Sequence, residues 1–140
     1  MAVTFIPELT DLDLYTPGLP IEAVRRQYGL ERVVKLASNE NPLGMSEKAR
    51  AAALAALAEV PRYPDGNGFD LKQAVSRHHD VAMNQIVLGN GSNDILEMVA
   101  RALLGPGSSA VYSKHAFAVY PLATLAAGAT GIEVPALDYG

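Results

Sequence analysis

The chain has 140 residues, of which 49% are hydrophobic, a share that predicts a packed core and excludes a disordered chain. Its formal net charge is −4 and its Lys and Arg residues are scattered, which argues against a nucleic-acid partner or a membrane-surface partner. The absence of cysteine excludes disulfides and thiolate metal sites. Because the sequence also lacks a long apolar run and a signal-peptide pattern, we expect a cytoplasmic protein.

The first half of the sequence predicts short helices separated by extended, proline-punctuated segments. Pro20 and Gly29 are typical of the start and end of one helix, and Ser46 and Pro61 mark the ends of a second. In chain order we expect an extended arm over residues 1–20, a helix over Ile21–Tyr28, a strand over Val33–Leu36, a polar loop over Ser38–Gly44 and a helix over Glu47–Glu59.

The second half predicts strands that alternate with helices. After a turn at Tyr63–Gly66 we expect a helix over Phe69–His79, a strand over Ile86–Leu88, a helix that starts at Ser92, a strand over Ala110–Tyr112, a helix over Tyr120–Ala127 and a strand over Ile132–Val134. This alternation is typical of an α/β fold with a parallel sheet and right-handed crossovers. Because a parallel sheet needs both faces covered and the chain stops just after a strand, we expect the front part of a longer protein.

A glycine turn joins the strand expected at Ile86–Leu88 to the helix that follows it. Gly89 and Gly91 permit a tight turn and close approach of the backbone, so the free N–H groups of the next helical turn can face an anion. The dinucleotide fingerprint is absent because Asp94 stands where its third glycine would fall, and no lysine follows as in a P-loop. From these residues alone, a phosphate site and a plain capped turn remain equally open.

Other side chains are less informative by themselves. Tyr63 could donate a hydrogen bond to an anion, although a half-buried turn tyrosine is the commoner role. Tyr112, Phe117 and Tyr120 follow an expected strand, where an aromatic ring could stack on a planar heterocycle, and core packing is the commoner role for at least two of them. Adjacent histidines at positions 78 and 79 point about 100° apart on a helix, so we expect no metal site.

Five motifs stand in a fixed order along nearly the whole chain. They are YTPG at residues 15–18, KLASNENPLG at 35–44, RYPDG at 62–66, IVLGNGSND at 86–94 and AVYSKHAFAVYP at 110–121. This series resembles the N-terminal part of the histidinol-phosphate aminotransferases, which are pyridoxal-phosphate enzymes of fold type I. The resemblance implies an α/β fold with an extended N-terminal arm and an incomplete, mostly parallel sheet flanked by helices.

The resemblance also implies a pyridoxal 5'-phosphate site shared between the subunits of a homodimer. By this resemblance, Gly91, Ser92 and Asn93 would bind the cofactor phosphate. Phe117 would stack on the cofactor ring, and Tyr63 would contact the phosphate in the neighbouring subunit. Substrate-covering roles fall on Tyr15, Asn39, Glu40 and Asn41. Phe117 stands where tyrosine is frequent and keeps the stacking face without the hydroxyl, and Asn93 stands where aspartate is frequent.

The implied reaction moves an amino group between histidinol phosphate and 2-oxoglutarate, giving imidazole acetol phosphate and glutamate in histidine biosynthesis. Residues 1–45 would form the arm, part of a small domain and the active-site cover, and residues 46–140 would begin the large cofactor-binding domain. The family's Schiff-base lysine lies beyond Gly140, and Lys35, Lys48, Lys72 and Lys114 stand in other motif contexts. We therefore expect the 140 residues alone to be inactive.

Two kinds of alternative remain open. Within the same enzyme class, the substrate could be an aromatic or other amino acid, or the reaction could be a threonine-phosphate decarboxylation. In a different class, the chain could be a non-catalytic phosphate-binding or interaction module that preserves the motifs.

Overall fold

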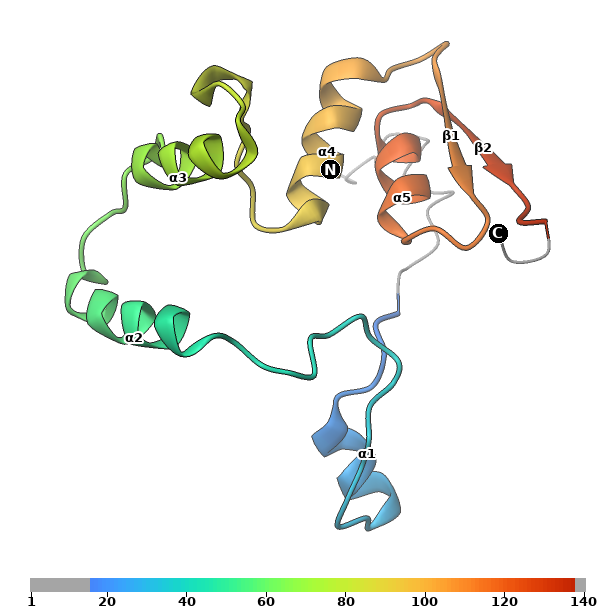
Figure 1. Cartoon of the computed structure of the whole chain (residues 1–140). Coiled ribbons are helices and arrows are strands. Elements are labelled where there is room, and N and C mark those ends of the chain that lie inside the picture. The colour runs from blue at the N-terminus through green and yellow to red at the C-terminus, as the bar shows by residue number, and fades with distance from the viewer. Residues whose placement is uncertain (1–15, 138–140) are drawn as a thin grey trace, which may run out of the picture. The chain divides into compact units, whose positions relative to one another are not determined.

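The computed structural model describes residues 16–137, which form two compact units. One unit is Thr16–Asn67, and the other holds the described residues from Gly68 onward (Figure 1). Tyr15, one of the residues expected to cover the substrate, lies outside the described residues. The two units are taken in turn below, each by itself.

The unit Thr16–Asn67 contains the helices α1 (Ile21–Tyr28) and α2 (Glu47–Ala56), with a 3-10 turn, η2, over Leu57–Glu59. Gly29 ends α1 in the left-handed region at φ 64°, and the Ser46 hydroxyl caps α2 by accepting from the Ala49 N–H at 3.1 Å. Both predicted helices are confirmed, although the second tightens into 3-10 geometry for its last turn.

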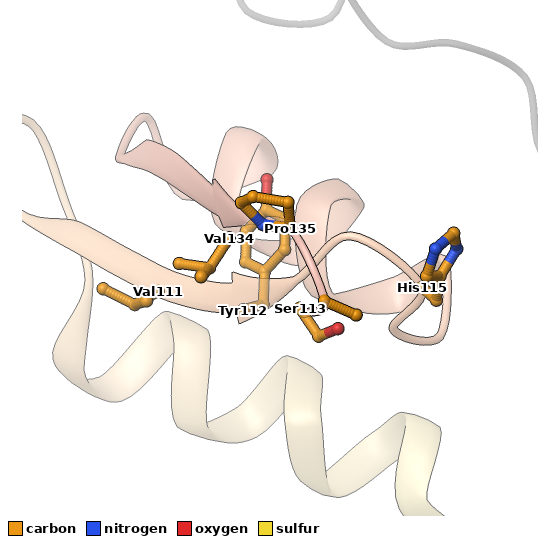
Figure 2. Close-up of a pocket in the computed structure, with 7 residues that line it drawn as sticks. Val111, Tyr112, Ser113, His115, Val134 and Pro135 are labelled. Atoms are coloured by element: carbon orange, nitrogen blue, oxygen red, sulfur yellow. The ribbon is translucent and has the colours of Figure 1, made fainter. Parts of the chain in front are cut away.

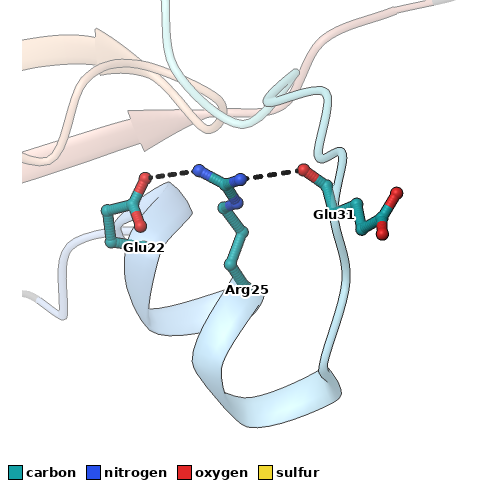
Figure 3. Close-up of polar contacts among 3 residues, drawn as sticks. All are labelled: Glu22, Arg25 and Glu31. Carbon is teal, nitrogen blue, oxygen red and sulfur yellow. Dashed lines mark hydrogen bonds and ion pairs between the residues drawn. The ribbon is translucent and has the colours of Figure 1, made fainter.

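Arg25 ties α1 to the segment that follows it. Its guanidinium pairs with Glu22 Oε1 at 3.1 Å and donates to the backbone carbonyl of Glu31 at 2.9 Å (Figure 3). The prediction of a strand at Val33–Leu36 is wrong, since the structure assigns no strand within the described part of this unit. A strand needs a partner strand, and a short apolar run does not supply one.

The second unit contains α3 (Phe69–His79), η3 (Met83–Gln85), α4 (Ser92–Leu103), β1 (Ser109–Ser113), α5 (Val119–Ala126) and β2 (Thr130–Val134). The strands β1 and β2 pair in parallel, from Ser109 opposite Thr130 to Ser113 opposite Val134, and α5 connects them. The parallel sheet and its helical crossover are therefore confirmed for two strands. The third strand expected, at Ile86–Leu88, is wrong, because that segment has no pairing with any described residue.

In the second unit, β1 and β2 run in the opposite direction to α4 and α5 (Figure 1). α5 packs against α4 and against both strands. The carboxyl ends of β1 and β2 lie at the same end of this unit as the amino ends of α4 and α5 (Figure 1). In parallel α/β sheets, ligands bind at this end, because strand ends and helix N-termini converge there.

The core is small, which contradicts the packed core expected from composition. Among residues 16–137, the buried apolar side chains are Ala100, Ala123 and Ala129, each 6% exposed. Larger apolar side chains remain accessible, including Val111, Ile132 and Val134 along one face of the two-stranded sheet. Two strands and two helices offer too little surface to enclose large side chains. No helix in the described part of the chain is both long and apolar enough to cross a membrane.

Candidate functional site

The turn before α4 exposes the backbone at the start of that helix. Gly91 occupies the N-cap position at φ 79° and ψ −177°, a conformation that is essentially restricted to glycine. A Cβ placed on Gly91 would meet nothing within 4 Å, so the space beside this backbone is open. An approaching group can therefore reach the main chain here without displacing a side chain.

The first residues of α4 bring hydrogen-bond donors to this open space. Ser92 and Asn93 are exposed and begin the helix, and no side chain of the described residues caps it. The N–H groups in the first turn of a helix lack intrahelical partners and lie at the positive end of its dipole. Donors, positive potential and open space together fit an anion such as a phosphate group.

Phe117 belongs to the loop between β1 and α5. This loop lies at the same end of the unit as the start of α4 (Figure 1). Its side chain is about half exposed, at 48%. Its neighbours Tyr112 and Tyr120 pack against each other instead, with ring centroids 6.5 Å apart and an interplanar angle of 32°. Tyr112 is half-buried but Tyr120 is 40% exposed, so this ring contact lies outside the buried core, and the core packing expected for at least two of the three aromatic residues is wrong.

A hollow that the sequence did not predict opens beside the ends of the strands. It has a volume of about 790 Å³, and it is lined by Val111–Ser113 from β1, by Val134–Ala136 from β2 and by His115 (Figure 2). The motif that contains Ser113 and His115 was already placed at a strand end, but the hollow depends on how β1 and β2 pair. Within residues 16–137, no three His, Asp or Glu side chains gather in a way that could hold a metal ion.

Tyr63 projects from the other unit and is fully exposed, at 102%. The half-buried packing role considered for this tyrosine is therefore wrong. The residue before it, Arg62, pairs with Glu59 through its guanidinium, which anchors the turn to the end of the preceding 3-10 helix. The phenol is left accessible to solvent or to another molecule.

The loop that contains Asn39, Glu40 and Asn41 is held largely by its own side chains. Asn41 Oδ1 accepts from the Leu43 N–H at 3.1 Å, and its Nδ2 donates to the Gly44 carbonyl at 2.8 Å. Glu40 Oε1 pairs with Lys35 Nζ at 2.6 Å. Asn39 is exposed. Asn41 therefore shapes the loop, while Glu40 and Asn39 keep accessible polar atoms.

Comparison with known proteins gives one family and consistent relatives. The family described as "Aminotransferase class I and II" matches residues 31–139. "Histidinol-phosphate aminotransferase 2" of Pseudomonas fluorescens is 56% identical over 136 residues, which is 96% of this chain and 37% of that protein. The protein of the same name in Nitrosospira multiformis is 58% identical over 90% of this chain and 33% of its own length.

A solved structure agrees with these relatives. The crystal structure of histidinol-phosphate aminotransferase from Sinorhizobium meliloti in complex with pyridoxal-5'-phosphate superimposes with a TM-score of 0.81 at 26% identity, over 96% of this chain and 35% of that one. The present chain thus spans about a third of the length of the curated relatives it matches. Its fold is part of the fold-type I aminotransferase fold. From the family match and these relatives together, the chain belongs to the class I and II aminotransferases.

Proposed function

We propose that this chain is the N-terminal part of a pyridoxal-phosphate-dependent histidinol-phosphate aminotransferase. The proposal is supported by relatives of that name at more than 50% identity and by the five ordered motifs. In it, residues 46–140 begin the large cofactor-binding domain, and residues 1–45 contribute to the small domain and to the cover of the active site. The small-molecule substrates are histidinol phosphate and 2-oxoglutarate.

The observation that carries the proposal is that two features of the second unit, the start of α4 and the loop before α5, lie at the same end of its sheet. The exposed amino end of α4 and the loop that holds Phe117 lie at the end where both strands terminate (Figure 1). A phosphorylated aromatic ring needs an anion site and a stacking surface at the same edge of a sheet. The unit offers both, from segments more than 20 residues apart in the sequence.

Gly91, Ser92 and Asn93 bind the phosphate in this proposal. The N–H groups of the first turn of α4 donate to its oxygens, and the Ser92 hydroxyl and Asn93 amide add side-chain donors. Asn93 is neutral, so it adds no repulsion toward a dianion. Pyridoxal phosphate, when bound, supplies the electron sink for amino-group transfer.

Phe117 and Tyr63 complete the cofactor site. Phe117 presents a half-exposed ring that orients the cofactor by stacking. Tyr63 is fully exposed, as expected for a side chain that reaches the phosphate bound by the partner subunit of a homodimer. Tyr15, Asn39, Glu40 and Asn41 cover the substrate and exclude water, and the Lys35–Glu40 pair holds one side of that loop.

A substrate comparison tests the proposal. The complete polypeptide, meaning this chain with whatever its gene encodes beyond Gly140, would be loaded with pyridoxal phosphate. It would then be assayed for glutamate formation from 2-oxoglutarate with histidinol phosphate or phenylalanine, and for decarboxylation of threonine phosphate. We expect histidinol phosphate to give the highest kcat/KM.

Other outcomes of this comparison identify other functions. A preference for phenylalanine would identify an aromatic aminotransferase, and threonine-phosphate decarboxylation would identify the decarboxylase. An absence of reaction with every substrate, despite bound cofactor, would favour a non-catalytic module. Each of these results would overturn the proposed substrate.

A further inference from the structure

Contacts within a few residues hold the turn that leads into α4. The N–H of Asn90 donates to Asp94 Oδ2 at 2.8 Å, and the N–H of Gly91 donates to the Gly89 carbonyl at 2.9 Å. Asp94 is the third residue of α4, so its carboxylate reaches back from the helix to the residue before its N-cap. The Asp94 side chain thus connects α4 to the loop that precedes it.

Gly89 makes this contact sterically possible. A Cβ on Gly89 would lie 2.9 Å from Asp94 Cβ and 3.1 Å from Ile95 Cδ1, closer than side-chain carbons normally approach. Its role differs from that of Gly91, which needs its backbone conformation and has open space around it. The absence of a side chain at Gly89 therefore lets the first residues of α4 pack against the loop over residues 89–91. The hydrogen bond to Asp94 stabilises this packing.

The charge of Asp94 makes this hydrogen bond consequential for the anion site. A carboxylate in the first turn stabilises the helix dipole, but a free carboxylate beside a bound phosphate would repel it. Asp94 is only partly exposed, and one of its oxygens is held by the Asn90 N–H. The hydrogen bond restrains the carboxylate while it orients the turn that precedes Ser92 and Asn93.

We propose that Asp94, seated against Gly89 and bonded to the Asn90 N–H, is a positioning residue for the phosphate site at the start of α4. The inference rests on the proposed function, since it assigns a role toward the phosphate of that cofactor. The Asp94 side chain does not contact the ligand. It fixes the direction in which the N–H groups of the first helical turn point.

The test compares Asp94→Ala and Asp94→Asn in the complete polypeptide, with Glu97→Ala as the matched control. Glu97 is an acidic residue further along α4 that pairs with Arg101 at 3.5 Å. Its replacement by alanine therefore removes a charge from the same helix without changing the loop before Ser92. The dissociation constants of pyridoxal 5'-phosphate and of pyridoxal, which lacks the phosphate, would be measured by fluorescence titration. Hydrogen exchange at the Asn90 amide would be followed by NMR.

Asp94→Ala should weaken pyridoxal phosphate about tenfold, or about 1.4 kcal/mol, and leave pyridoxal unchanged. It should also accelerate exchange at the Asn90 amide. Asp94→Asn keeps an oxygen acceptor and should remain within about threefold of the wild type, and Glu97→Ala should match the wild type. If Asp94→Ala does not fold, the Asn variant decides: a loss of affinity of about tenfold in Asp94→Asn would assign the effect to charge and overturn the positioning role.

Two further outcomes keep the inference separate from the function on which it rests. If the wild type prefers pyridoxal phosphate over pyridoxal but both Asp94 variants bind it equally well or more tightly, the positioning role is overturned and the proposed function stands. If the wild type binds the two compounds equally, no phosphate site exists at this turn. Both proposals are then overturned.

Discussion

Replacing Gly91 with alanine separates backbone conformation from available space at the candidate phosphate site. At φ 79° and ψ −177° the residue occupies a region where a side chain costs about 1–3 kcal/mol, although its Cβ would have no neighbour within 4 Å. The unliganded variant should relax this strain by rotating the turn. Binding must then restore the strained conformation, and about 2 kcal/mol corresponds to roughly 30-fold weaker binding of pyridoxal phosphate.

Gly105→Ala is the matched control for this experiment. A Cβ at Gly105 also meets nothing within 4 Å, but the backbone there is not in the left-handed region. The assay is fluorescence titration of the complete polypeptide with pyridoxal phosphate, and thermal unfolding of the unliganded variants verifies that they are folded. Equal affinities for the two alanine variants would refute the reasoning, because both change the side chain and only one changes the permitted conformation.

Three other substitutions test separate contacts. Ser46→Ala should lower the free energy of unfolding by about 1 kcal/mol, because the hydroxyl accepts from the Ala49 N–H, whereas Ser46→Asp should retain the cap; chemical denaturation measures both, and equal stability of the Ala variant and the wild type would contradict the capping role. Phe117→Ala should weaken pyridoxal phosphate and pyridoxal alike by about fivefold, while Phe117→Tyr should bind as the wild type; a loss confined to the phosphorylated compound would argue against ring stacking. Tyr63→Phe should leave thermal stability unchanged, since the side chain is fully exposed, but should weaken pyridoxal phosphate more than tenfold without affecting pyridoxal; a variant that binds both as the wild type does would exclude a hydrogen bond to the phosphate.

The helices could be predicted from the sequence because their ends are set by local chemistry. α1 runs from the residue after Pro20 to the residue before Gly29, and α3 occupies the range that its apolar spacing predicts. Strand formation depends on a partner that can be distant in the chain. The extended segments at Val33–Leu36 and Ile86–Leu88 therefore looked like strands in the sequence but have none beside them among the described residues.

In the candidate site, too, the features set by local sequence could be predicted, and those set by packing could not. The glycine turn and the helix that starts at Ser92 could be predicted from residue types and order. The hydrogen bond from Asn90 to Asp94, the crowding at Gly89 and the full exposure of Tyr63 could not, because they depend on side-chain rotamers and packing. The hollow beside His115 was missed for a similar reason, since it forms only when β1 and β2 pair.

A crystal structure of the complete polypeptide with pyridoxal 5'-phosphate tests the central claim most directly. We expect the phosphate oxygens to lie about 3 Å from the backbone nitrogens of Ser92 and Asn93, with the pyridine ring over Phe117. A phosphate bound elsewhere, with the N–H groups at the start of α4 facing only water, would contradict the account.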